Sequence, residues 1–381
     1  TTASSAGANF GFALLWALAF SVVAPMVLQE MAARLGLVTR EGLAEAMRHT
    51  LQSRWLGRAA VILVVAAVGL GNAAYEAGNI AGAALALASV TPMGNVFWSI
   101  TVGVVAAGLL ASGRYKVLES VLIALVLLMS TVFLLTAWVV APPIGQLLGG
   151  LFNPSLPTGS TLTVIALIGT TVVPYNLFLH ANAVREKWGP ELPLVQSLRE
   201  SRWDTGLSIG LGGLITLAIL STAAMAFFQT GKSFSADSLA NQLEPLLGES
   251  ARYVFAAGLF AGGLTSAITA PLAAAYAVCG ALGLRQGLGQ RSFQLIWVLV
   301  LLTGTVFAAL GSKPLAAILF AQAANGFLLP VVALFLLLVM NQSTLLGEHT
   351  NGVLANILGA VVVLIAVGLG GVKLAGVFGL M

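Results

Sequence analysis

Residues 165–180 of the chain read IALIGTTVVPYNLFLH, an apolar run that contains Gly169 and Pro174. Pro174 has no backbone N–H to donate and its ring collides with the carbonyl group four residues earlier, so we expect the helix to unwind near mid-membrane, over Val173 to Asn176. Unwinding frees carbonyl oxygens around Thr170 to Val173 and places the side-chain oxygen of Asn176 beside them. Hard divalent cations bind several oxygen ligands of this kind. A proline kink that binds nothing is the alternative interpretation.

The composition places the whole chain in a lipid bilayer. Of its 381 residues, 59% are hydrophobic and only 8% are charged, whereas soluble domains have about 25% charged residues. The apolar residues form long blocks rather than alternating strands, which excludes a β-barrel. We therefore expect an all-α polytopic protein, integral to a bacterial plasma membrane. The single Cys279 leaves no disulfide framework and no CxxC metal site.

Ten apolar segments are long enough to cross the membrane, which takes about 20 helical residues. Charged residues and Pro, Gly or Asn mark their ends. They run over residues 10–33, 57–88, 94–111, 117–140, 160–187, 205–229, 250–283, 293–310, 314–339 and 352–374. Residues 1–381 are thus expected to form a single transmembrane domain.

The basic residues between these segments gather on one side of the predicted membrane. That side holds Arg34, Arg40, Arg48, Arg54, Arg58, Arg114, Lys116, Arg185, Lys187, Arg199, Arg202, Arg285 and Arg291. The opposite side holds only Lys232, Arg252, Lys313 and Lys373, beside Asp237, Glu244 and Glu249. By the positive-inside rule the first side is cytoplasmic. The net charge of +4 therefore reflects the orientation of the protein in the membrane. We expect a lipid bilayer as partner and no nucleic acid.

The same alternation of connecting segments between the two sides of the membrane places Thr1 on the external side. No initiator Met, signal-peptide pattern or cationic anchor precedes it. An upstream helix would normally carry that end across the membrane, so we expect the chain to be a fragment that lacks at least one amino-terminal span. A true amino terminus at Thr1 is the alternative.

A second polar stretch, residues 70–79, reads LGNAAYEAGN inside the second apolar segment. Asn72, Glu76 and Asn79 follow an i, i+4, i+7 spacing and share one helix face. A carboxyl group is costly in the bilayer core and usually marks an ion or proton pathway. The alternative is a polar stripe that fixes helix packing.

Two further groups of polar residues lie in apolar segments. His180 follows Asn176 at i+4, where it either relays protons or caps a buried hydrogen bond. Gln322 and Asn325 share a face at i, i+3 in the ninth segment. Their amides offer oxygens without charge, or serve only as hydrogen bonds between helices.

Residues 173–180, VPYNLFLH, resemble the sixth-helix signature M-P-H-N-L-x-L-H of the Nramp family of divalent metal transporters. Further similar stretches follow in the family's order along the chain: FGFALLW at 10–16, ARLG at 33–36, SRWDT at 201–205, LEPLLG at 243–248 and AQ at 321–322. The resemblance implies a LeuT-type fold, in which two inverted five-helix repeats surround a midplane site and the first and sixth helices are broken. It also implies that the chain spans family helices 2 to 11, with the first helix and its D-P-G-N motif largely before Thr1.

The resemblance implies a metal site at the Val173 carbonyl, Tyr175, Asn176 and Gln322, and an ion or proton pathway through Glu76, Asn79 and His180. Several positions depart from the family pattern. Val173 replaces the metal-binding Met, Tyr175 replaces a His, Asn79 replaces one member of an acidic pair, and no Arg occurs within 293–310. Loss of the soft thioether weakens the preference for Mn, Fe and Cd over Mg. These changes resemble the Nramp-related magnesium transporters, a branch thought to carry hydrated Mg²⁺ without proton coupling.

We therefore expect an importer of divalent cations, Mg²⁺ or Mn²⁺/Fe²⁺, that works by alternating access. The metal is the cargo, and no cofactor is expected. A proton-coupled Mn²⁺/Fe²⁺ symporter and a non-transporting metal sensor are the alternatives. The sequence has no HExxH zinc pair, facing carboxylate dyad or Ser/His arrangement, so no enzyme is expected. The oligomeric state stays open.

Overall fold

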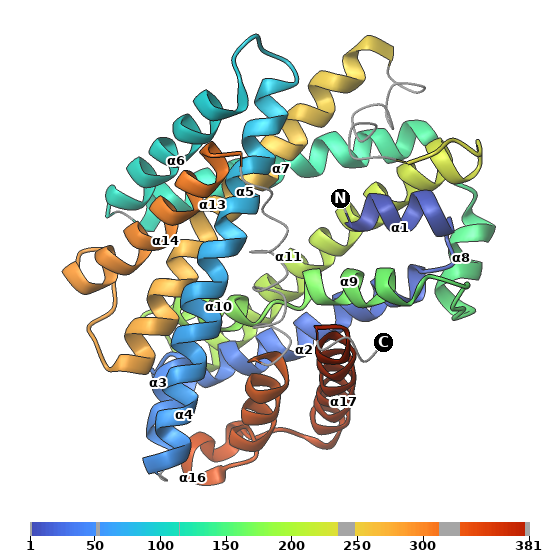
Figure 1. Cartoon of the computed structure of the whole chain (residues 1–381). Helices are drawn as coiled ribbons and strands as arrows, with labels where there is room; N and C mark the ends of the chain where they lie inside the picture. Colours follow the sequence, from blue (N-terminus) through green and yellow to red (C-terminus); the bar gives the residue numbers. More distant parts are fainter. Residues whose placement is uncertain (1, 51–53, 114, 235–247, 312–327, 378–381) are drawn as a thin grey trace.

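The computed structural model describes residues 2–50, 54–113, 115–234, 248–311 and 328–377, and within these ranges every regular element is a helix (Figure 1). The all-α fold expected from the sequence is thereby confirmed. The helices are α1 (Thr2–Phe10), α2 (Leu15–Thr39), α3 (Leu43–Thr50), α4 (Arg54–Val64), η1 (Val65–Leu70), α5 (Gly71–Ala88), α6 (Asn95–Ala111), α7 (Tyr115–Val140), α8 (Ile144–Phe152), α9 (Thr161–Thr171), α10 (Pro174–Lys187), α11 (Leu194–Ala223), η2 (Ala224–Phe228), η4 (Gly248–Ser250), α13 (Ala251–Leu282), α14 (Arg291–Ala309), α16 (Ser343–Leu346), η5 (Gly347–His349) and α17 (Val353–Val377).

Among the described residues, seven helical stretches are long and apolar enough to cross a membrane. An eighth arises if Leu328–Val339 and Ser343–His349, which meet at a 73° bend, form one span. Two shorter apolar helices, Asn95–Ala111 and Val353–Gly368, match the remaining predicted segments. The chain is therefore a multi-pass membrane protein, as predicted.

The amino-terminal segment differs from the prediction of a first span over residues 10–33. The spanning helix α2 starts only at Leu15, because Gly11 adopts a left-handed φ of +58° and ends the preceding helix α1. Helix α1 is short and rich in small residues, and its Gly7 lies against the backbone carbonyl of Leu220. Helix α1 is largely buried against α9, α11 and η2. The predicted external position of the chain start stays a prediction.

Polar contacts join the basic segments at one end of the helix bundle. Arg34 Nη1 donates to the carbonyl of His349 at 2.9 Å, and Arg40 Nη1 donates to the carbonyl of Trp188 at 2.7 Å. Arg34 also pairs with Glu30 one turn earlier, at 2.9 Å. Each of the two long-range contacts connects segments that were predicted to lie on the same side of the membrane, and the cytoplasmic assignment of that side stays a prediction. We call this end, which carries Arg34, Arg40, Arg48, Arg185 and Arg202, the basic end.

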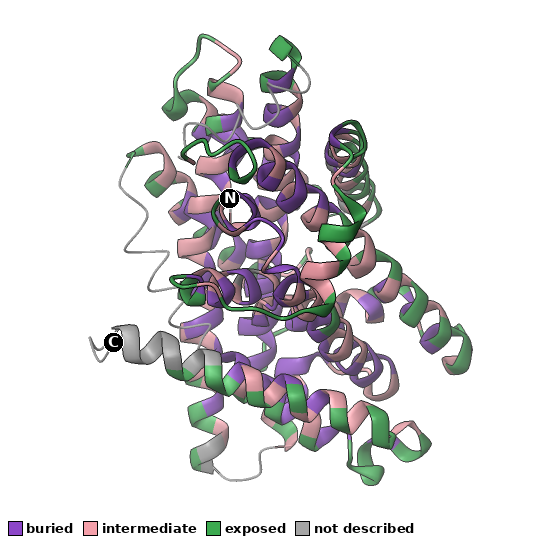
Figure 2. Ribbon diagram, turned by 90° about the vertical axis from the view of Figure 1, so that its right-hand side faces the viewer, coloured by how far each residue is buried: buried purple, intermediate pink, exposed green. Residues whose placement is uncertain are grey.

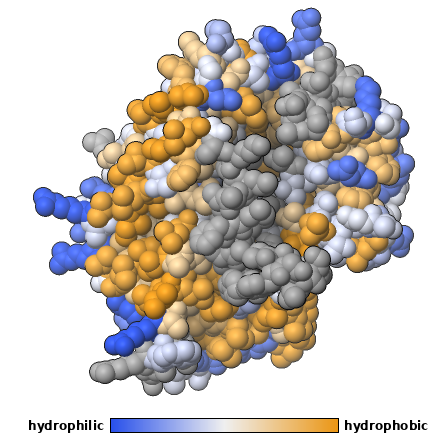
Figure 3. Space-filling model, viewed as in Figure 1, coloured by the Kyte–Doolittle hydropathy of each residue, from blue (hydrophilic) through white to orange (hydrophobic). Residues whose placement is uncertain are grey.

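Small residues allow the inner helices to approach one another closely. A Cβ at Gly36 of α2 would collide with the carbonyl oxygen of Ala181 on α10, and a Cβ at Gly263 of α13 would lie 2.8 Å from Ala83 on α5. Close backbone approach of this kind is typical of membrane helices, where packing replaces the hydrophobic driving force. Buried residues concentrate in the middle of the bundle (Figure 2). The face seen in Figure 3 has broad apolar areas, as contact with lipid requires.

Candidate functional site

The predicted break in the fifth apolar segment is present. Helix α9 ends at Thr171, α10 starts at Pro174, and the two residues between them are non-helical, with φ, ψ of −92°, 77° at Val172 and −98°, 123° at Val173. The position differs slightly from the expected unwinding over Val173 to Asn176. The reason is that Pro174 occupies the first helical position, where its fixed φ suits a helix start, so the helix resumes at once.

This geometry limits what the Val173 carbonyl can offer to an ion. The backbone N–H of Asn176 donates to the Val173 oxygen at 3.1 Å, which closes the first turn of α10. One lone pair of that oxygen is therefore occupied, and the other is available to a ligand. The Val173 carbonyl thus fits a water-mediated or single direct contact to a cation.

The side chain of Asn176 is free to bind a ligand, whereas its backbone N–H is engaged with the Val173 oxygen. Its amide makes no hydrogen bond with any other described residue, and the residue is partly exposed. An unpaired amide oxygen in the first turn after a helix break is well suited to bind a hard cation. This agrees with the predicted ligand role, which stays a prediction.

Tyr175 connects the break to the polar stretch on α5. Its ring lies against that of Tyr75, with centroids 6.5 Å apart and an edge-to-face angle of 62°. Tyr75 directly precedes Glu76, so the helix break and the predicted pathway lie side by side. The sequence placed both features at mid-membrane without predicting this contact.

The three polar residues of α5 form one connected face, as their spacing predicted. Asn72 and Glu76 are fully buried. Asn79 Nδ2 donates to Glu76 Oε2 at 3.2 Å, and Asn72 Nδ2 donates to the Ala270 carbonyl of α13 at 2.9 Å. Glu76 Oε1 and Asn72 Oδ1 have no partner among the described residues. The buried Glu76 oxygen can accept a proton, and both unsatisfied oxygens can contact a cation.

Helix α14 packs directly over Glu76. A Cβ at Gly304 would collide with Cγ of Glu76, so the absence of a side chain at Gly304 makes room for the glutamate. No salt bridge to Glu76 is present in the described part of the chain. A single hydrogen bond donated by Asn79 does not offset the desolvation of a charged carboxylate. The site is therefore poised to change its protonation or to bind a cation.

His180 lies on the α11 side of α10. Its Nε2 is 3.0 Å from Thr205 Oγ1, a hydrogen-bond distance. The hydrogen bond that was expected as one of two roles is thus present, while the proton-relay role stays a prediction. The remaining predicted ligand, Gln322, and its neighbour Asn325 lie outside the described residues. Within those that are described, no group of three or more His, Cys, Asp or Glu residues could hold a metal ion.

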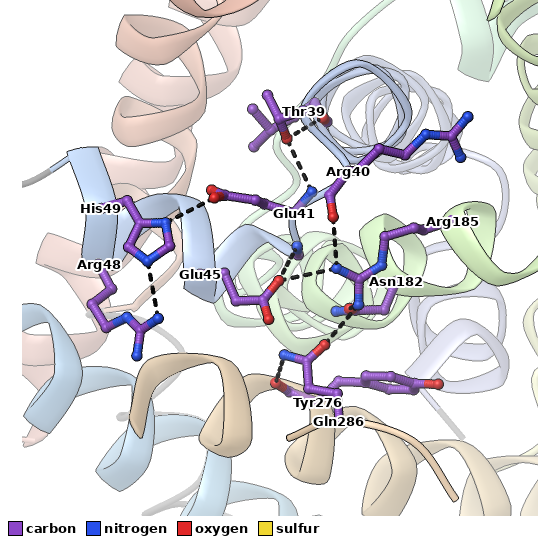
Figure 4. Close-up of polar contacts among 12 residues, drawn as sticks. Thr39, Arg40, Glu41, Glu45, Arg48, His49, Asn182, Arg185, Tyr276 and Gln286 are labelled. Carbon is purple, nitrogen blue, oxygen red and sulfur yellow. Dashed lines mark hydrogen bonds and ion pairs between the residues drawn. The ribbon is translucent and has the colours of Figure 1, made fainter. Parts of the chain in front are cut away.

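The sequence analysis missed a polar cluster around Arg185 at the basic end (Figure 4). Arg185 Nη1 donates to the Arg40 carbonyl and to Glu45 Oε2, both at 3.0 Å. Its Nη2 donates to Asn182 Oδ1 at 2.9 Å and to Gln286 Oε1 at 2.8 Å. These contacts tie α10 to the turn between α2 and α3 and to the loop after α13. Any movement of α10 at this end must break them or carry their partners along.

Comparisons with known proteins agree with this geometry. The family model described as "Natural resistance-associated macrophage protein-like" (Nramp) matches residues 1–375. A divalent metal cation transporter, MntH, of Mycobacterium tuberculosis is 30% identical over 355 residues, which cover 91% of this chain and 80% of the relative. The MntH of Klebsiella pneumoniae is 27% identical over 97% of this chain and 88% of its own length.

Solved structures give the same fold. A manganese transporter of Eremococcus coleocola has a TM-score of 0.77 at 23% identity, over 99% of this chain and 84% of that one. A Na⁺-coupled sialic acid symporter has a TM-score of 0.52 at 12% identity, over 96% and 91%. These likenesses confirm the LeuT-type fold that was expected from the sequence.

Proposed function

The chain belongs to the Nramp family, and from that premise we propose that it carries divalent metal cations across the plasma membrane. Its relatives include proteins named as divalent metal cation transporters. The observation that carries the proposal is the break between α9 and α10, where the Asn176 amide is unpaired among the described residues. Transport proceeds by alternating access around this break.

In this proposal the ion is held by oxygen atoms. Asn176 and the Val173 carbonyl are direct or water-mediated ligands, Tyr175 shapes the wall toward α5, and Gln322 completes the shell when the site closes. The metal is substrate, and no resident cofactor takes part. With the sulfur ligand absent at Val173, Mg²⁺ is the favoured cargo, because hard oxygen ligands suit Mg²⁺ and leave it partly hydrated.

Metal flux into proteoliposomes tests this function. We expect Mg²⁺ to enter vesicles that contain the protein, and to compete with Mn²⁺ for uptake, because an oxygen-only site discriminates weakly between the two. Protein-free vesicles are the control. Strong Mn²⁺ uptake that Mg²⁺ does not reduce would defeat the Mg²⁺ proposal, and the absence of any metal flux would favour a metal sensor over a carrier.

A second candidate is a proton-coupled Mn²⁺/Fe²⁺ symporter, which the buried Glu76 favours. Its free Oε1 and its contact with Asn79 suit a group that gains and loses a proton during transport. In this case Glu76→Gln is expected to remove metal-dependent acidification of the vesicle lumen, because Gln preserves shape but does not titrate.

Glu191→Gln, at an exposed position of the basic end, is the matched control for that variant. A pH-sensitive dye inside the vesicles reads the proton movement. If the unmodified protein transports metal without acidification, and Glu76→Gln transports equally well, the symporter is excluded and Glu76 has a packing role.

A further inference from the structure

An apolar groove of about 520 Å³ runs along the outer surface of the bundle. One wall is formed by α4, η1 and α5, and the other by α13 and α14. Ile62 and Leu70 line the first wall, and Leu282 and Leu299 line the second; Thr303 is the one polar side chain among the described lining residues. Ile62 is 68% exposed and Leu70 is 61% exposed. Since both walls belong to membrane-spanning helices, the groove opens toward lipid.

Three arginines lie close along the chain, or in direct contact, to residues at the basic end of the two walls. Arg58 lies exposed on α4 one turn before Ile62, on the same helix face. The Arg48 guanidinium lies against Gly283, next to Leu282 at the foot of the other wall. Arg285 is exposed two residues further along the chain.

Of these three arginines, Arg48 contacts the ring of His49, with its Nη2 2.9 Å from Nε2 (Figure 4). No carboxylate pairs with Arg48, Arg58 or Arg285 in the described part of the chain. The nearby acids are engaged elsewhere, as Figure 4 shows: Glu41 contacts His49 at 2.8 Å, and Glu45 contacts Arg185 at 3.0 Å. An anionic group at this end of the groove would meet uncompensated positive charge.

Trp55 indicates how deep in the bilayer these three arginines lie. It lies on α4 one turn before Arg58 and is 76% exposed. Exposed Trp side chains at the ends of spanning helices sit at the level of lipid headgroups. The arginines are therefore at headgroup depth, and the apolar groove extends from them toward the bilayer centre.

We propose that this groove is a binding site for an anionic phospholipid of the cytoplasmic leaflet. One acyl chain lies along η1 and α14, and the phosphate lies between Arg58 and Arg285. Basic pockets between membrane helices on the cytoplasmic side recognise anionic headgroups by this combination of charge and apolar surface. The site is separate from the break between α9 and α10 and does not depend on which metal the protein carries.

Native mass spectrometry of the purified protein tests the site. The protein in detergent is titrated with phosphatidylglycerol or with phosphatidylcholine of identical acyl chains, and the dissociation constant of the first bound lipid is compared. We expect phosphatidylglycerol to bind at least about fivefold more tightly, since each Lys or Arg near an anionic headgroup contributes roughly that factor. Equal affinities for the two lipids would overturn the proposal.

Matched variants locate the site. Arg58→Gln combined with Arg285→Gln is expected to bring phosphatidylglycerol affinity down to that of phosphatidylcholine. Arg199→Gln, an equal charge change at an exposed position of α11 outside the groove, should leave the preference intact. An equal loss in Arg199→Gln would show diffuse surface charge instead of a site.

The apolar part has its own pair of variants. Ala66→Phe fills the groove and is expected to weaken the binding of both lipids. Ala124→Phe, at an exposed position of α7 away from the groove, should leave the binding of both unchanged. Retained binding in Ala66→Phe would overturn the acyl-chain placement. Size-exclusion profiles and helical circular dichroism establish that each variant is folded.

Discussion

Asn176→Ala is expected to lower divalent metal uptake by about a hundredfold, the upper end of what single changes around a metal site cost. The substitution removes a side-chain amide oxygen in the first turn of α10 that has no partner among the described residues. The backbone hydrogen bond from residue 176 to the Val173 carbonyl is kept, and Ala is a good helix former. The loss should therefore appear in uptake of radioactive metal into proteoliposomes and not in the unfolding temperature.

Asn176→Asp is the matched control for this prediction. It keeps an oxygen ligand, and a carboxylate in the first turn of a helix is favoured by the helix dipole. We expect this variant to retain uptake within about tenfold of the unmodified protein. Full uptake by Asn176→Ala would mean that this amide only shapes the break, and the proposed ligand set would have to be replaced.

The break itself is the part of the fold that the sequence predicted best. Pro174 and Gly169 act through local sterics, so no tertiary information is needed to place an interruption there. The exact register needed one more rule, that Pro is favoured at the first helical position, which moves the non-helical residues to Val172 and Val173. The buried helix α1 was not predicted because its nine residues, most of them small, carry too weak a hydropathy signal to indicate a separate helix.

Within the candidate site, the sequence could predict which residues share a face of one helix, but not which helices contact one another. The 3.6-residue period placed Asn72, Glu76 and Asn79 on one face, and the hydrogen bond from Asn79 to Glu76 follows from it. The contact of Tyr75 with Tyr175 joins segments a hundred residues apart, and nothing local specifies it. The same holds for the packing of Gly304 over Glu76.

The cluster around Arg185 shows a different limit. Charge counting placed Arg40 and Arg185 on the same side of the membrane, which the structure confirms as proximity at the basic end. It could not identify which acid each arginine contacts, because many charged residues share that side. Partner choice there depends on the crossing of α2 and α10, whose closeness is set by Gly36 against Ala181.

Val173→Met is expected to change which metal the protein prefers. Residue 173 sits in the break with an extended backbone and is half-buried, next to the proposed ligand Asn176. A thioether is a soft ligand that favours Cd²⁺ and Mn²⁺ over Mg²⁺. We expect Cd²⁺ to become about tenfold more effective than before as a competitor of uptake, a gain of about 1.4 kcal/mol in binding, while Mg²⁺ uptake falls.

Val173→Leu separates the effect of sulfur from that of size. Leu enlarges the side chain without adding a ligand, so it should alter the rate of Mg²⁺ uptake without raising competition by Cd²⁺. The comparison measures competition curves for both metals on both variants in the same vesicles. If Cd²⁺ competes no better in Val173→Met than in Val173→Leu, the side chain at position 173 does not reach the ion. The missing thioether then gives no reason to favour Mg²⁺, and the choice of cargo rests on ligands outside the break.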